Sequence, residues 1–107
     1  MYEDLWQVEI SNNKLVITDP QQNIQTIQLS DIQGIVIRTD DSGPAGSDVF
    51  WFISDGSSLV SFPMGARGEA KVLDTLQKIE GFDNVEFIKA MGSVDNKLFY
   101  ILNRAKE

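Results

Sequence analysis

Three carboxylates lie close together in the stretch DDSGPAGSD at residues 40–48, and carboxylates can bind a metal ion or act as an acid–base pair. A calcium loop needs oxygen ligands at alternating positions, a glycine at the turn and a bidentate acid at its end. Asp40, Ser42 and Asp48 could supply oxygens, but Gly-Pro-Ala at 43–45 fills the middle, and the spacing matches no EF-hand. The stretch therefore predicts a chain-reversing loop without a metal, and a small metal-dependent hydrolase using this loop is a second alternative function.

The usual catalytic groups are missing from the sequence, which has no histidine and no cysteine. A Ser-His-Asp or Cys-His arrangement therefore cannot form, and neither can a disulfide or a zinc site of the ordinary type. Paired carboxylates such as Asp40 and Asp41 could act on a glycosidic bond only in a sugar-sized cleft, for which 107 residues leave little room. We expect a protein that is not an enzyme and needs no cofactor.

The stretch FPMGARGEAK, residues 62–71, runs through glycines into a predicted helix, with Arg67 and Lys71 nearby. Backbone amides at such a helix start can bind an anion. The stretch is neither a P-loop nor a dinucleotide fingerprint, and Glu69 would already occupy the positive end of the helix. A plain helix start is the favoured interpretation.

The formal net charge is −7, and it is unevenly distributed along the chain. Residues 1–66 contain nine acids and two bases, whereas residues 67–107 contain seven of each. An acidic surface repels phosphate backbones and anionic lipid, so we expect no nucleic acid and no membrane as partners. A basic protein would be attracted, although a charge of this size also serves solubility alone.

Length and composition indicate one soluble domain over residues 1–107, because 42% hydrophobic and 23% charged residues are ordinary for a globular protein. The first ten residues have neither the basic nor the apolar region of a signal peptide, and no apolar run reaches the length of a membrane span. We therefore expect a cytoplasmic location.

The first two thirds of the chain alternates in hydrophobicity, which predicts short strands separated by turns. Asn12-Asn13 suits a tight hairpin turn, Asp19-Pro20 begins the next turn, and Asp55-Gly56 predicts a type I′ hairpin. The predicted strands are LWQVEI, KLVIT, IQTIQL, GIVIRT, VFWFIS and SLVSF.

The last third changes to a helical period from Glu69 to about residue 80, with Gly81 as a left-handed stop. Asp83 and Glu86 then match a capping box, and the spacing of Phe82 and Phe87 matches a hydrophobic staple. This predicts a short second helix to about Met91, followed by KLFYIL as a closing strand.

Two predicted strands are apolar on both faces, which indicates a central position or a cover over one face. In the strand at 49–53, Phe50 and Phe52 oppose Val49, Trp51 and Ile53. We expect the first helix to cover the face of Phe50 and Phe52. The face of Trp51 must then meet another layer or another molecule, so Trp51 is either core or part of an interface.

These elements predict an α+β fold: an antiparallel six- to seven-stranded meander, strongly coiled or barrel-like, with one main helix, a short second helix and a closing strand. The order of elements is similar to that of the pleckstrin-homology domain. The closing strand after the helices departs from that family, whose chain normally ends in its helix. A likeness of element order alone implies no function.

The sequence also resembles a small, uncharacterised bacterial protein family through the phrases TDDSGP, DVFW, FPMGARGE, GFDN and AMGS. The resemblance spans roughly residues 24–102 and implies no activity.

Successive turns of a meander alternate between the two ends of its sheet, so one rim is predicted to collect most of the unbalanced acids. These would be Glu3, Asp4, Asp19, Asp40, Asp41 and Asp48. Acids are common at turns in any protein, so the cluster has a plain structural explanation as well. With Trp51, these residues are the candidate partner-binding set.

The function expected from the sequence is a non-enzymatic acidic module that binds a basic protein partner, in the manner of an immunity or antitoxin-like protein. The alternative is a pleckstrin-homology-like module that binds a lipid headgroup or a peptide, although its first hairpin turn has only Lys14 as a basic residue. A homodimer is also compatible with the sequence.

Overall fold

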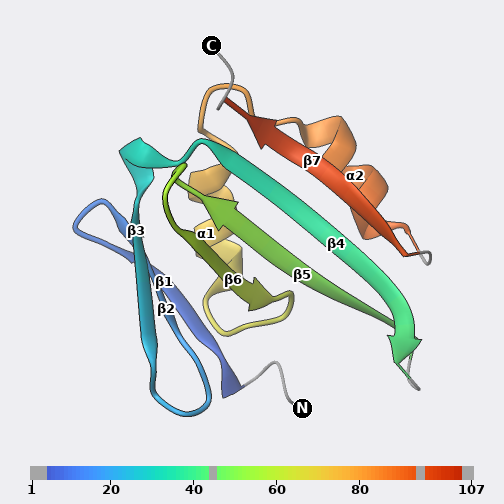
Figure 1. The fold of residues 1–107 in the computed structure, drawn as a ribbon, viewed down its shortest axis with the longest axis horizontal. Helices are drawn as coiled ribbons and strands as arrows, with labels where there is room; N and C mark the ends of the chain where they lie inside the picture. The colour runs from blue at the N-terminus through green and yellow to red at the C-terminus, as the bar shows by residue number, and fades with distance from the viewer. Residues whose placement is uncertain (1–4, 44–45, 94–95, 105–107) are drawn as a thin grey trace.

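A computed structural model describes residues 5–43, 46–93 and 96–104, with only the backbone described at 40–43 and 46–48. The described residues form seven strands and two helices. Figure 1 shows the helices behind the sheet that contains β4 and β5. The elements are β1 (Gln7–Ser11), β2 (Lys14–Thr18), β3 (Ile24–Gln28), a short 3-10 turn η2 (Leu29–Asp31), β4 (Gly34–Gly43), β5 (Gly46–Ser54), β6 (Leu59–Pro63), α1 (Glu69–Leu76), α2 (Asn84–Met91) and β7 (Lys97–Asn103).

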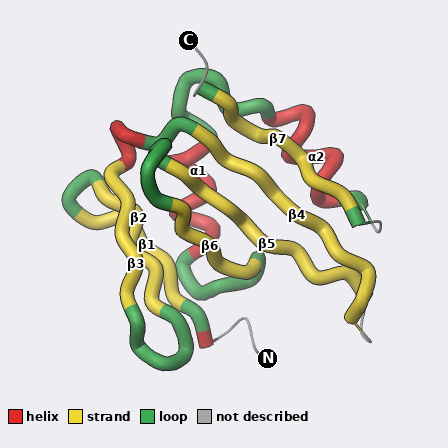
Figure 2. Tube along the Cα trace, in the orientation of Figure 1, coloured by secondary structure: helices red, strands yellow, loops and turns green. Residues whose placement is uncertain are grey.

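The strands form two antiparallel sheets, which confirms the predicted α+β class but divides the meander. One sheet has the order β1-β2-β3 and the other the order β6-β5-β4-β7, so the closing strand pairs with β4. The chain passes from one sheet to the other at the η2 turn (Figure 2). Within the part of the chain that the structure describes, pairing does not close the strands into a barrel, so the barrel-like form is not confirmed.

The predicted loop at 40–48 is largely an extension of two strands, because β4 and β5 continue their pairing into it. Asp40 pairs with Asp48 and Gly43 with Gly46, with a register irregularity between the two pairs. Glycine at the end of a strand pair tolerates the backbone angles of a tight reversal. The prediction of a long loop at 40–48 was therefore wrong, because the backbone of most of this stretch is paired as strand.

The core lies between the two sheets and the two helices and is built from the inward side of every strand. Leu15, Ile17, Ile35, Ile37 and Ile53 each expose none of their surface. Strict alternation puts such residues on one side of a strand, so each sheet has one buried side.

Trp51 at the middle of β5 connects the larger sheet to both helices. Its ring is stacked on Phe62 of β6 and tilted against Phe87 of α2, each at 5.8 Å between ring centroids. Its indole Nε1–H donates to the Glu69 carboxylate at the start of α1, at 2.8 Å. The helices therefore cover the Trp51 face, and the prediction that the first helix covers Phe50 and Phe52 was wrong.

The structure confirms several turns and helix ends that local sequence signals predicted. Asn12 and Asn13 have the expected positive φ of 53° and 65°. The Asp83 carboxylate accepts a hydrogen bond from the Glu86 backbone N–H at 3.0 Å, and the rings of Phe82 and Phe87 lie 6.0 Å apart. The staple contact and the N-cap half of the predicted capping box are therefore formed. The reciprocal half is not, because the Asp83 backbone N–H donates to the Ile101 carbonyl at 2.8 Å.

Two boundaries differ from the sequence prediction. The first helix ends at Leu76, short of residue 80, and turns continue to Gly81, whose φ is +99°. The Asp55-Gly56 hairpin is not of type I′, because only Gly56 has a positive φ. The Asp55 carboxylate instead accepts the backbone N–H groups of Ser57 and Ser58, which widens the connection to four residues.

The backbone just before α1, at Arg67 and Gly68, lies against β1 of the smaller sheet. The backbone N–H of Val8 donates to the Arg67 carbonyl at 2.8 Å, and the Arg67 N–H donates to the Trp6 carbonyl at 2.9 Å. Gly68 has a φ of +88°, and a Cβ there would overlap the carbonyl oxygen of Val8. Only glycine allows both this backbone angle and this approach.

We expect Gly68→Ala to lower the free energy of unfolding by at least about 2 kcal/mol, because left-handed strain and a backbone overlap add together. The control is Gly92→Ala, since Gly92 has a negative φ of −98° and its Cβ would meet nothing closer than 3.9 Å. Urea unfolding followed by tryptophan fluorescence measures both. Equal losses in the two variants would contradict this account of Gly68.

We expect Glu69→Ala to cost about 2–3 kcal/mol, because it leaves the buried Trp51 indole N–H and the Gly65 backbone N–H without their acceptor. Glu69→Gln keeps one carbonyl acceptor and should cost less. The measurement is the free energy of unfolding in urea. An alanine variant as stable as the wild type would show that these two hydrogen bonds contribute nothing.

Candidate protein-binding surface

Of the acidic residues that were predicted to share one rim, Asp19 is the one whose side chain the structure describes. In Figure 1 the β2–β3 turn, which contains Asp19, lies at the bottom of the molecule, and the β4–β5 hairpin lies at the lower right. Asp40, Asp41 and Asp48 lie on the backbone of that hairpin, and their side chains are outside the described part of the chain, as are Glu3 and Asp4. The predicted acidic rim therefore stays a prediction.

Trp51 is only 1% exposed, so it belongs to the core and is not available to a partner. Of the two interpretations that the sequence left open for this residue, the core interpretation is correct.

Asp19 already serves the turn in which it lies. Its carboxylate accepts the backbone N–H groups of Gln21 and Asn23, each at 2.9 Å, and the Asn23 side-chain amide at 3.2 Å. The hydrogen bond from the Asn23 backbone is the main cause that holds the pKa of Asp19 below its usual value. The residue is partly exposed, and its first role is to stabilise the turn.

The side of the larger sheet opposite to the helices is not covered by another element of the described chain. Its residues form rows across the strands: Phe52 pairs with Val36 and Ser61, and Val36 pairs with Tyr100. In the next row Phe50 pairs with Arg38, which pairs with Leu98. We call this surface, defined by Val36, Arg38, Phe50, Phe52, Leu98 and Tyr100, the outer face.

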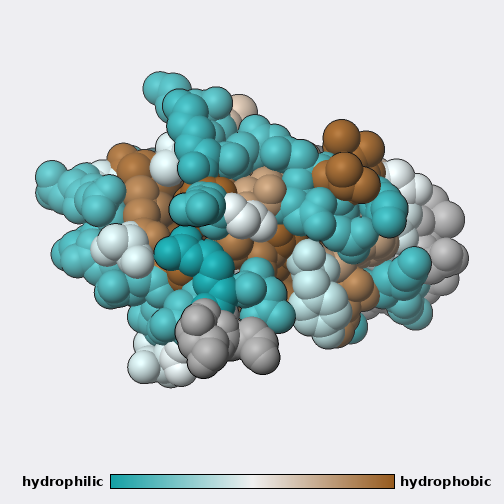
Figure 3. All heavy atoms as spheres, turned by 90° about the horizontal axis from the view of Figure 1, so that it is seen from above, coloured by the Kyte–Doolittle hydropathy of each residue, from teal (hydrophilic) through white to brown (hydrophobic). Residues whose placement is uncertain are grey.

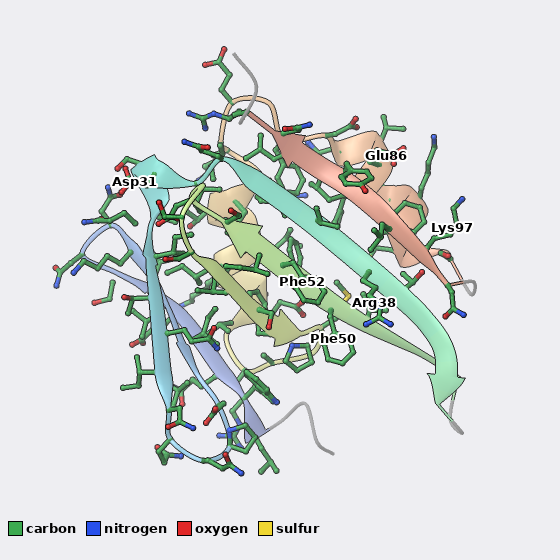
Figure 4. All side chains as sticks on the ribbon, in the orientation of Figure 1. Asp31, Arg38, Phe50, Phe52, Glu86 and Lys97 are labelled. Carbon is green, nitrogen blue, oxygen red and sulfur yellow. The ribbon has the colours of Figure 1, made fainter. Side chains whose placement is uncertain are left out.

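The outer face is apolar for a surface that meets solvent. Phe50, Phe52 and Val36 are half-buried by their neighbours, whereas Tyr100 and Leu98 are 59% and 51% exposed. Figure 4 shows Phe50, Phe52 and Arg38 close together on the side of the sheet that faces the viewer, with the helices behind. An antiparallel sheet with one solvated side normally presents polar residues there, so an aromatic outer face is typical of an interaction surface.

The charges around the outer face are unbalanced in the sequence. Residues 34–63, which form β4, β5 and β6, contain four acids and a single base. The base is Arg38, at the centre of the face, and Asp40 and Asp48 form the pair two residues further along the same strands. The hairpin therefore carries an acidic end next to an aromatic surface.

The predicted helix start at residues 62–71 borders an open groove of about 1210 Å³ between β1 and α1. Arg67 and Lys71 line it, but so do Glu9 and Asp74, so the groove has no dominant sign of charge. The Glu69 carboxylate accepts the Gly65 N–H at 2.9 Å, which is an amide that an anion would need. The interpretation as a plain helix start agrees with this geometry.

The described residues contain no group of three or more acidic side chains arranged to hold a metal ion. The second alternative, a metal site at 40–48, falls on side chains outside that part of the chain and stays a prediction. Neither helix approaches the about 20 residues that a membrane-crossing helix needs, because each has eight.

No family model, no curated protein and no solved structure matches this chain.

The sequence indicated that β5 has two apolar sides, but it did not indicate which of them forms the outer face. The alternation at 49–53 showed that β5 is apolar on both faces, so one face had to be covered by something. Both halves looked equally suited to the core. The contacts of Trp51 with Glu69, Phe62 and Phe87 show that the Phe50 and Phe52 half faces outward.

The stability of the β5–β6 connection should depend on pH through Asp55. The hydrogen bond from the Ser58 backbone, followed by that from Ser57, holds the pKa of Asp55 below 3.8. Because the folded pKa is lowered, this contribution is complete at neutral pH and is lost as the pH falls below 3.8 through the folded value. We expect Asp55→Ala to lower Tm slightly at neutral pH and to match the wild type near the acid limit.

Ser57→Ala is the control for Asp55→Ala, because it keeps the backbone N–H that the carboxylate accepts. Its Tm should remain close to that of the wild type at every pH. Thermal unfolding measured across the acid range tests both variants. A difference between Asp55→Ala and the wild type that persists undiminished at the lowest pH would contradict the assigned hydrogen bonds.

Proposed function

We propose that this protein is a non-enzymatic binding module whose outer face docks a basic protein partner through an apolar patch. Two neighbouring cross-strand rows support this, one of Phe52, Val36 and Tyr100 and the other of Phe50, Arg38 and Leu98. They lie on a side of the sheet that no other described element covers. Aromatic side chains supply large contact areas at protein interfaces.

The charge distribution selects the chemistry of the partner. The net charge of −7 comes entirely from residues 1–66, and these include the long hairpin that bears the outer face. A partner with basic residues around an apolar patch gains from both features, because complementary charge speeds the encounter and apolar contact supplies affinity. A small acidic protein with these properties suits the role of an immunity or antitoxin-like factor that blocks a basic protein.

The central Arg38 fits this arrangement as a specificity element. The register places it between Phe50 and Leu98, within the apolar rows. An arginine in an aromatic surface can bind a carboxylate or the face of an aromatic ring of the partner. It would reject partners that present a cation at the same point.

The test compares three forms of the protein as bait in a lysate of its source organism: wild type, a Phe50→Ser/Phe52→Ser double variant and Ile24→Ser. Ile24 is the matched control because it is a large apolar side chain, 65% exposed, on β3 of the other sheet. We expect a basic protein to be captured by the wild type and by Ile24→Ser. The double variant should bind at least about tenfold more weakly, since central aromatic contacts dominate binding energy.

Binding at low and at high salt supplies a second measure that does not depend on any variant. Electrostatic attraction to a basic partner is screened by salt, so association should slow as the ionic strength rises. Capture that is insensitive to salt, or capture of acidic proteins only, would contradict the proposal. Retention of the partner by the double variant would move the binding site away from the outer face.

The same protein preparations can test the alternatives. Binding to anionic vesicles would favour the pleckstrin-homology-like module. Heat released on addition of calcium, magnesium or manganese would favour the metal-dependent hydrolase at 40–48.

A further inference from the structure

The edge of the larger sheet at β7 combines a strand edge with exposed apolar side chains. Among the described residues β7 pairs only with β4, so its other edge has no strand partner. Eight large apolar residues are exposed in the described part of the chain, and five of them lie on α2 and β7. These five are Val85, Ile88, Met91, Leu98 and Tyr100.

The five side chains lie on both sides of the β7 edge. Leu98 and Tyr100 belong to the outer face, whereas α2 packs against the other side of β7 with Phe87 and Ala90 turned inward. Val85 and Ile88 therefore project outward from α2, at 64% and 67% exposure. Figure 3, which shows the molecule from above, has a protruding hydrophobic group over the α2 side of this edge.

We propose that this surface, which we call the β7 edge, binds the β7 edge of a second copy of the chain in a two-fold symmetric dimer. A strand edge is complementary to itself when two copies are related by a two-fold axis, because antiparallel strands exchange the same hydrogen bonds in both directions. The two four-stranded sheets would then continue as one. The apolar groups on each side of the strand would be buried together with it.

The charge balance around the β7 edge favours a second copy of the chain as the occupant over a basic protein. Residues 67–107, which contain α2 and β7, carry seven acids and seven bases, whereas the rest of the chain has a net charge of −7. α2 and β7 themselves contain Glu86, Lys89 and Lys97, so two copies that pair through these elements bring few like charges into the contact itself. A basic partner gains nothing from charge at such a surface.

The charged side chains near the β7 edge are of both signs. Glu86 and Lys89 form an ion pair of 3.2 Å on α2, and Lys97 begins β7. Figure 4 shows Glu86 and Lys97 at different points along this edge. In an antiparallel arrangement the acid of one copy can approach a base of the other, so the charges add specificity without net repulsion.

The described contacts limit the length of strand that can pair. The Asp83 backbone N–H donates to the Ile101 carbonyl at 2.8 Å, so that part of the edge is already occupied. Residues 97–100 remain for a partner strand. Since a stable interface buries about 800 Å² on each partner, such a short pairing needs the flanking apolar side chains as well.

The dimer extends beyond the proposed function because it does not require any other partner. A two-fold axis perpendicular to the joined sheet keeps the two outer faces on the same side. A dimer would therefore present two copies of the outer face next to each other, and a multivalent partner could bind both. Loss of dimerisation and loss of partner capture are measured separately, so either proposal can fail alone.

The molecular mass in solution tests the dimer, measured by sedimentation or light scattering over about a hundredfold range of protein concentration. We expect the wild type to approach twice 12.0 kDa at high concentration and to fall to 12.0 kDa on dilution. Ile88→Glu and Tyr100→Glu place charges in the contact and should remain at 12.0 kDa throughout. Ile24→Glu, the control on β3, should behave as the wild type.

Amide hydrogen exchange of the wild type supplies a measure without variants, since residues 97–100 should become more protected as the concentration rises. The two glutamate substitutions are at positions 67% and 59% exposed, so both variants should fold with unchanged tryptophan fluorescence. A wild type that stays at 12.0 kDa over the whole range would overturn the proposal and leave the surface to a different protein. Dissociation by Ile24→Glu as well would also overturn it.

Discussion

The position of Trp51 determines how the layers of this protein are stacked. Its ring packs against Phe62 and Phe87, and its indole N–H donates to the Glu69 carboxylate, so one side chain contacts the sheet, α2 and the start of α1. A buried tryptophan needs both close packing and an acceptor for its N–H. Because Glu69 is the first residue of α1, meeting that need positions the helix. Glu69 also accepts the Gly65 N–H, which joins the loop before the helix to the same carboxylate.

Once both helices lie on the Trp51 side, no other described element covers the opposite side of β5. The same strand that supplies the centre of the core therefore supplies Phe50 and Phe52 to the outer face. The apolar outer face is thus a direct consequence of which side the helices occupy. A sheet that is apolar on both sides needs two covering layers, and the described chain provides one.

The two proposed surfaces meet at β7 but differ in charge. The outer face is carried mainly by a hairpin in the acidic part of the chain, whereas the β7 edge lies in the part with equal numbers of acids and bases. Net charge thus separates a surface suited to a basic protein from one suited to an identical chain. Leu98 and Tyr100 contribute to both, so self-association would extend the outer face and would not replace it.

Local sequence signals determined the elements: the alternation of β1 to β6, the Asn12-Asn13 turn, the Asp83 cap and the Phe82–Phe87 contact depend on residues a few positions apart. They also determined the α+β class and the uneven charge. The tertiary structure alone decided that β7 pairs with β4, that the strands divide into two sheets, and that Trp51 faces inward while Phe50 and Phe52 face outward. Alternation has a period of two and is the same for either face, so it cannot state which face meets a helix. That choice depends on contacts between residues far apart in the chain, such as Trp51 with Glu69 and with Phe87, whose geometry exists only after the chain has folded.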